Sequence, residues 1–119
     1  MPSNNPAQRF TDIIESITRI FRFTSGLKVG SFSEDEQVVH AVKYGLVIIN
    51  EAASKLGDAA TDLAPQIAWR EIRSLGNRLR HEYDGIDTVR IWLMVERELP
   101  ELLAASERAL DSLSQTKQS

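Results

Sequence analysis

The stretch FTDIIESITRIF, residues 10–21, decides the fold class. Its apolar residues recur at intervals of three and four, which is the spacing of one face of an α-helix, while charged residues fill the other face. That apolar face comprises Phe10, Ile13, Ile14, Ile17, Ile20 and Phe21. Gly26 is a suitable residue to end the helix. The pattern predicts an amphipathic helix that buries one side.

Similar patterns follow along the chain. Ser33 and Glu36 have the spacing of a capping box, so a second helix is expected to begin there, after a glycine- and serine-containing loop, and to end at Gly57. A short helical turn is expected over 58–63, a third helix over about 68–83, and a fourth after Asp87, with Val89 in its buried stripe and a kink or a fresh start at Pro100. No segment has the alternation typical of a strand. The sequence therefore predicts an all-α fold, an antiparallel four- to five-helix bundle.

Length and composition bound the domain organisation. The chain has 119 residues, 42% of them hydrophobic and 26% charged, which is typical of one globular domain. We expect a domain over residues 9–113, a flexible arm over 1–8 and a flexible tail over 114–119. There is no cysteine, which excludes disulfides and thiolate metal sites. Because no segment resembles a signal peptide or the ~20 apolar residues of a membrane span, we expect a cytoplasmic protein without membrane contact.

The charge is unevenly distributed. The net charge of −3 would not by itself attract a polyanion. Four arginines nevertheless gather around the third predicted helix beside a single carboxylate, Glu71; they are Arg70, Arg73, Arg78 and Arg80. Arg70 and Arg73 are therefore candidate substrate-binding residues.

The third predicted helix also carries residues with suitable chemistry. At 100° per residue, Asn77 and His81 lie about 40° apart around the helix and one turn apart along it, and Arg78 lies within about 60° of His81. An imidazole can move a proton, a guanidinium can hold a phosphate, and an amide can orient either group. Such a set suits phosphodiester cleavage by a ribose 2′-hydroxyl. The alternative is a surface helix of mixed charge that ends in a packed tyrosine, Tyr83.

Other sites find little support in the sequence. His40 is interpreted as a partly exposed helical histidine without a role. No carboxylate or histidine set has the spacing of a metal site, and no glycine-rich phosphate loop occurs, so neither a metal nor another cofactor is expected.

The segment WREIRSLGNRLRHEYDGID, residues 69–87, resembles the signature of the HEPN superfamily, and specifically of its HepT-like toxin branch. Other features fit in the same order: the stretch NEAA at 50–53, a proline ahead of Trp69, the pair Ile91-Trp92 and the step Leu99-Pro100. The resemblance extends from about residue 10 to residue 110.

This resemblance implies a function. HepT-like proteins are helical bundles that form a homodimer, in which two copies of the motif line one cleft, and they act as metal-independent endoribonucleases in toxin-antitoxin systems. Their partner is a cognate minimal nucleotidyltransferase antitoxin, which can attach AMP to the motif tyrosine. By this resemblance His81 would be the general acid or base, Asn77 would orient it or the phosphate, and Tyr83 would be the AMPylation site.

One position departs from the family pattern. The pattern has an arginine, then four to six residues, then the histidine, and the usual position of the arginine, directly before the asparagine, is Gly76 here. Arg73 is too early, about two turns or ~12 Å before His81. Arg78 or Arg80 could supply the cation, and losing such a donor commonly costs ~10²-fold or more in rate. Gly76 thus favours an alternative function, in which the domain binds nucleotide or RNA without catalysis and docks a nucleotidyltransferase.

Overall fold

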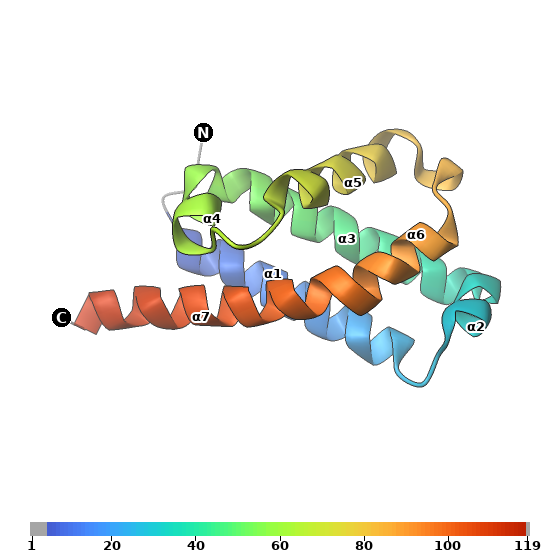
Figure 1. Ribbon diagram of the computed structural model, residues 1–119, viewed down its shortest axis with the longest axis horizontal. Coiled ribbons are helices and arrows are strands. Elements are labelled where there is room, and N and C mark those ends of the chain that lie inside the picture. Colours follow the sequence, from blue (N-terminus) through green and yellow to red (C-terminus); the bar gives the residue numbers. More distant parts are fainter. Residues whose placement is uncertain (1–4, 119) are drawn as a thin grey trace.

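The computed structural model describes residues 5–118, with side chains through Gln115. No β-strand occurs within this range (Figure 1). The elements in chain order are α1 Pro6–Thr24, α2 Val29–Glu34, α3 Glu36–Leu56, α4 Asp58–Leu63, α5 Trp69–His81, the 3₁₀ turn η1 Tyr83–Gly85, α6 Thr88–Leu93, the π-helical turn η2 Met94–Glu98, and α7 Leu99–Gln118.

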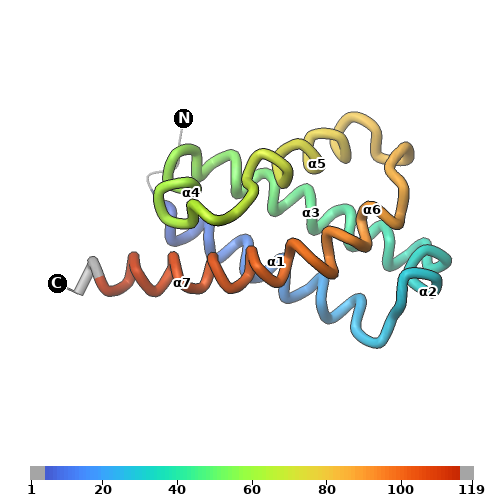
Figure 2. Tube along the Cα trace, viewed as in Figure 1, coloured from blue at the N-terminus to red at the C-terminus, as the bar shows by residue number. Residues whose placement is uncertain are grey.

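The long helices form an antiparallel bundle. Helix α1 packs against both α3 and α7, and α5 packs against α3. Tracing the chain in Figure 2 shows that the direction reverses between α1 and α3, between α3 and α5, and between α1 and α7. The largest fully buried side chains come from these four helices and from α2, α6 and η2. They include Phe10, Phe32, Ile13, Ile17, Ile49, Leu56, Leu79, Ile91, Met94 and Leu102. The predicted all-α bundle is confirmed.

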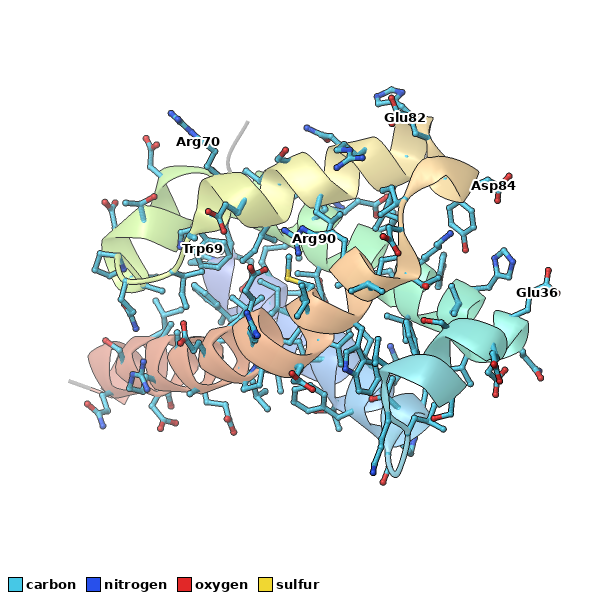
Figure 3. The ribbon with its side chains drawn as sticks, turned by 45° about the vertical axis from the view of Figure 1, so that its right-hand side comes forward. Glu36, Trp69, Arg70, Glu82, Asp84 and Arg90 are labelled. Carbon is cyan, nitrogen blue, oxygen red and sulfur yellow. The ribbon has the colours of Figure 1, made fainter. Side chains whose placement is uncertain are left out.

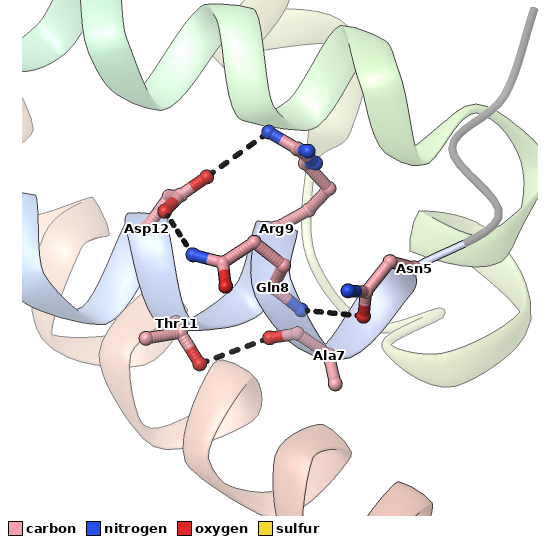
Figure 4. A network of polar contacts seen from close by, with 6 residues as sticks. All are labelled: Asn5, Ala7, Gln8, Arg9, Thr11 and Asp12. Carbon is pink, nitrogen blue, oxygen red and sulfur yellow. Dashed lines mark hydrogen bonds and ion pairs between the residues drawn. The ribbon is translucent and has the colours of Figure 1, made fainter.

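Helix α1 begins ahead of the expected domain start at residue 9. Pro6 takes the first helical position, where its missing N–H costs nothing, and the Asn5 side chain accepts a hydrogen bond from the Gln8 backbone N–H at 3.1 Å. Gln8 and Arg9 both contact Asp12, at 2.8 and 3.2 Å (Figure 4). Residues 5–8 of the expected arm therefore belong to a capped helix, while residues 1–4 lie outside the described range.

The predicted capping box of Ser33 and Glu36 is wrong. The cap of α3 is Asp35, whose side chain accepts from the Val38 backbone N–H at 3.1 Å. Ser33 lies instead in the short helix α2, where its hydroxyl accepts a hydrogen bond from Thr88 at 2.8 Å. The segment expected as a loop is helical because the Phe32 side chain is fully buried and holds this turn against the bundle.

The last helical segment bends without breaking. Pro100 has no N–H to donate, and the turn just before it is π-helical, with the Leu99 N–H bonded to the Met94 carbonyl. The chain then continues as α7 to Gln118, through most of the expected tail, and Ser119 lies outside the described range. Val89, expected to be buried, is 45% exposed because it lies about 200° around the helix from the buried Ile91.

Helix α4 ends at Leu63, before Pro65, as expected. Between residues 5 and 118, the structure contains no helix with the length and apolarity to cross a bilayer.

Candidate active site

Helix α5 separates an apolar face from a polar one. Trp69, Ile72, Leu75 and Leu79 are at most 7% exposed and pack into the core. The Trp69 ring nitrogen donates to the Ala64 carbonyl at 2.9 Å, which fixes the start of the helix. The opposite face therefore points away from the bundle.

Polar side chains on this outward face line a groove. The α5 groove is an open surface groove of about 450 Å³ formed by Arg70, Arg73, Ser74, Asn77 and Arg78. Figure 3 shows Arg70 pointing away from the bundle while the neighbouring Trp69 points into it. Four residues named from the sequence, two of them catalytic candidates, thus share one surface.

A second groove adjoins the first and adds an arginine that sequence analysis missed. It has a volume of about 220 Å³ and shares Arg70, Ser74 and Arg78 with the α5 groove, but its far wall carries Arg90 of α6. Arg90 lies between α5 and α6 in Figure 3. Its guanidinium is 4.0 Å from the Glu98 carboxylate. No sequence signal joins Arg90 to the cluster at 70–80, because only the packing of α6 brings it there.

His81 is the last residue of α5, and its side chain is exposed. Along the helix it follows Asn77 by one turn, ~6 Å, on the same outward line. In the described part of the chain its imidazole has neither a hydrogen bond nor an ion pair. The ring is therefore accessible to a substrate that lies along the α5 groove.

Two of the candidate arginines face α3. One terminal nitrogen of Arg73 donates to the Ala53 and Gly57 carbonyls, at 3.2 and 3.4 Å, and so satisfies the C-terminal end of α3. Arg80 lies 3.7 Å from the Glu51 carboxylate of α3, in an exposed ion pair. Arg78 lines both grooves on the other side of the helix. Of these arginines, Arg78 is therefore the one best placed beside Asn77 to meet a phosphate.

Gly76 faces α3 rather than the groove. A β-carbon added there would overlap the Asn50 β- and γ-carbons. Asn50 itself is fully buried, and neither polar atom of its side chain has a partner among the described residues. The absence of a side chain at Gly76 thus lets α5 approach α3 closely. A side chain at this position could not reach the groove without separating the two helices.

Tyr83 lies beyond the end of α5, in the turn η1, and contacts α3. Its hydroxyl is 3.0 Å from Nδ1 of His40 and donates to the His40 carbonyl at 3.2 Å. The two rings stack with centroids 5.4 Å apart. The buried Lys43 donates to the Tyr83 carbonyl at 2.7 Å and lies 4.7 Å above the tyrosine ring. His40, interpreted from the sequence as having no role, is therefore the closest side-chain neighbour of the Tyr83 hydroxyl.

Burial raises the pKa of the Tyr83 hydroxyl above its ordinary value, and the neighbouring Asp84 carboxylate raises it further. The phenol consequently stays protonated at neutral pH. Any reaction at its oxygen must dispose of that proton.

The structure thus divides the predicted residues into two groups. Asn77, Arg78 and Arg70 lie on the outward face of α5 with His81 at its end, whereas Arg80 and Tyr83 turn toward α3, and Arg73 bridges the two surfaces. Among the described residues, no group of three or more histidine, aspartate or glutamate side chains is arranged to hold a metal ion.

Comparison with known proteins identifies the family. The model of the family "Ribonuclease HepT-like" matches residues 13–109. A protein of Thermococcus cleftensis named "Probable ribonuclease HepT" is 33% identical over 97 residues, which cover 82% of this chain and 88% of that protein. A "Putative RNase" of Methanocaldococcus jannaschii is 31% identical over 91 residues, covering 76% and 84% of the two chains. No solved structure matches the chain. The matched segment spans all of α3 and α5 and includes the α5 groove, His81 and Tyr83. The chain therefore belongs to the HepT-like ribonuclease family.

Proposed function

We propose that this chain is a cytoplasmic, metal-independent endoribonuclease, the toxin of a toxin-antitoxin system, which cuts RNA along the α5 groove. The observation that carries the proposal is the alignment of Asn77 and His81 on one exposed line of α5, with Arg78 beside them in the groove. The family match and the names of the relatives support RNA as the substrate.

In the proposed reaction, the 2′-oxygen of a ribose attacks the adjacent phosphorus and the bond from phosphorus to the 5′-oxygen breaks. The products are a 2′,3′-cyclic phosphate and a 5′-hydroxyl. His81 takes the proton of the 2′-hydroxyl or gives one to the leaving 5′-oxygen. Arg78 stabilises the charge that develops on the phosphoryl oxygens, and Asn77 orients the phosphate or the imidazole. Arg70 and Arg73 hold the flanking phosphates.

The need for both an acid and a base supports a homodimer. The chain has two histidines, and the one other than His81, His40, contacts Tyr83. A second imidazole for RNA cleavage would therefore come from His81 of a second copy, with the outward faces of two α5 helices lining one cleft.

We further propose that a minimal nucleotidyltransferase antitoxin neutralises the nuclease by attaching AMP to Tyr83. Tyr83 follows His81 by two residues, so a nucleotide attached to it would bring negative charge and bulk to the end of α5 that carries His81. Intact-mass measurement after co-expression with such an enzyme tests this part. We expect the mass of one or more AMP groups on the wild type and on Tyr44→Phe, and no added mass on Tyr83→Phe.

One observation favours a second function, that of a non-catalytic module which binds nucleotide or RNA and docks a nucleotidyltransferase. The position that carries the motif arginine in the family is Gly76, and it faces α3. Incubation with RNA in excess EDTA separates the two functions. The nuclease function requires fragments that end in 2′,3′-cyclic phosphate, whereas intact RNA at high protein concentration, with retained RNA binding, would establish the binding module.

A further inference from the structure

The side chains of Tyr83, His40 and Glu36 lie in a row, and the proposed RNA chemistry uses none of them. Nδ1 of His40 lies 3.0 Å from the hydroxyl, and Nε2, on the other side of the same ring, lies 3.8 Å from the Glu36 carboxylate. Glu36 and His40 are one turn apart on α3, and Tyr83 comes from the turn after α5. A hydroxyl, an imidazole and a carboxylate in this order are the arrangement by which proteins activate an oxygen nucleophile.

The tautomer of His40 decides what this line can do. The Glu36 carboxylate is exposed and lies 3.8 Å from Nε2, so it makes no hydrogen bond there but attracts a hydrogen to that nitrogen electrostatically. In that tautomer Nδ1 is an acceptor. The hydroxyl then has two acceptors within reach, Nδ1 at 3.0 Å and the His40 carbonyl at 3.2 Å. Nδ1 alone can keep the proton when the oxygen reacts.

The other neighbours of Tyr83 hold it in position. Lys43 donates to the Tyr83 carbonyl and covers one part of its ring. Tyr83 is therefore held against α3 even without the contact between its hydroxyl and His40. The charged groups around Tyr83 and His40 are Lys43, which lies over the Tyr83 ring, Glu36, which lies beside His40, and Asp84 from η1. His40 is exposed and Tyr83 is only partly covered, so a reagent can reach the oxygen from solvent.

We propose that His40, oriented by Glu36, is the base that activates the Tyr83 hydroxyl for nucleotidyl transfer. The Tyr83 oxygen attacks the α-phosphorus of a nucleoside triphosphate, the bond from that phosphorus to the pyrophosphate oxygen breaks, and pyrophosphate leaves. The phenolic proton passes to Nδ1 of His40. This inference rests on the proposed function in taking Tyr83 as the acceptor, and it adds that the acceptor's own chain supplies the base. A base is needed because a phenol is protonated at neutral pH.

The test measures the reactivity of Tyr83 directly, with benzenesulfonyl fluoride as the probe. The tyrosine oxygen bonds to sulfur, fluoride leaves, and a base must take the proton. The chain has two tyrosines, and Tyr44, which is 66% exposed, serves as an internal reference in the same molecule. Peptide mapping gives the labelling rate of each tyrosine in the wild type, His40→Ala, His40→Gln, Glu36→Gln and the control Gln37→Ala, an exposed α3 position.

We expect His40→Ala and His40→Gln to lower the Tyr83 rate by about tenfold or more, because a general base typically contributes ~10²-fold or more, and to leave Tyr44 unchanged. Glu36→Gln should cause a smaller loss. Added imidazole should restore labelling in His40→Ala.

A purely structural role for His40 predicts the opposite result. Removal of the stacked ring would uncover Tyr83, so its labelling would rise or stay the same, and added imidazole would have no specific effect on it. Raised or unchanged labelling of Tyr83 in His40→Ala, or no rescue by imidazole, overturns the proposal. The labelling needs neither RNA nor a nucleotidyltransferase, so its failure is distinguishable from a failure of the proposed nuclease function or of AMP transfer on co-expression.

Discussion

Gly76 of α5 lies so close to Asn50 of α3 that even a methyl group at Gly76 would overlap the asparagine side chain. This contact sets the distance between the helix that carries the groove and the helix that holds Tyr83. Position 76 therefore belongs to the interface between the two helices.

Replacement of this glycine is therefore expected to destabilise the fold. Gly76→Ala should lower the free energy of unfolding by about 1–3 kcal/mol, because the overlap outweighs the ~1 kcal/mol that alanine gains over glycine in a helix. Gly30→Ala is the matched control, since a β-carbon there meets no atom within 4 Å. Urea unfolding followed by circular dichroism measures both variants. An unchanged or higher midpoint for Gly76→Ala would mean that α3 and α5 can separate freely at this point.

Arg78 should be the most important arginine for RNA cleavage. Arg78→Ala is expected to lower the single-turnover cleavage rate by about 10²-fold, because the phosphoryl charge loses its donor. Arg78→Lys should recover only part of the rate, since an ammonium cannot make the bidentate contact. Arg80→Ala should have a smaller effect, because Arg80 faces Glu51. A larger loss in Arg80→Ala than in Arg78→Ala would transfer the role to Arg80.

The basic groove should make RNA binding depend on salt. For single-stranded RNA, removal of one phosphate contact should reduce the slope of log affinity against log salt concentration by about 0.7. We expect this reduction for Arg70→Ala and none for Arg108→Ala, which changes an exposed arginine of α7. Fluorescence anisotropy of a labelled RNA at several salt concentrations gives both slopes. Equal slopes would exclude Arg70 from the binding surface.

Glu98 should make stability depend on pH. Burial raises the pKa of the Glu98 carboxyl, Arg90 lowers it, and Glu71 and Glu101 raise it, with a net upward shift. As pH rises through the carboxyl range, the unfolded chain loses this proton first, so ionisation in the folded state costs stability. Glu98→Gln should therefore unfold at a higher temperature than the wild type at pH 7, and the difference should disappear near pH 4. Glu107→Gln is the exposed control on α7. A lower melting temperature for Glu98→Gln at pH 7 would show that the ion pair with Arg90 dominates.

The helical bundle could be predicted from the sequence because periodicity is a local property. The apolar residues of 10–21 repeat regularly enough to identify a buried face, and Gly57, Pro65 and Asp87 mark ends and caps by their own backbone chemistry. The predicted start of α3 is wrong because Ser33 and Asp35 are both good caps. The helix before Asp35 depends on the burial of Phe32 and on the contact of Ser33 with Thr88, which join it to the rest of the bundle.

The candidate site was predictable only where it lies on one helix. The line from Arg70 to His81 follows from helical spacing within α5. The contacts of Tyr83 with His40 and of Gly76 with Asn50 join positions far apart in the chain, and Arg90 reaches the groove only through the packing of α6. Such relationships depend on how helices pack, which a single sequence does not specify.

The most direct test of the account is the single-turnover rate at which the purified protein cuts a labelled RNA in excess EDTA, compared with that of His81→Ala and of Arg108→Ala. We predict cleavage to 2′,3′-cyclic phosphate ends by the wild type, the same rate for Arg108→Ala, and none above background for His81→Ala. Undiminished cleavage by His81→Ala would contradict the proposed role of α5.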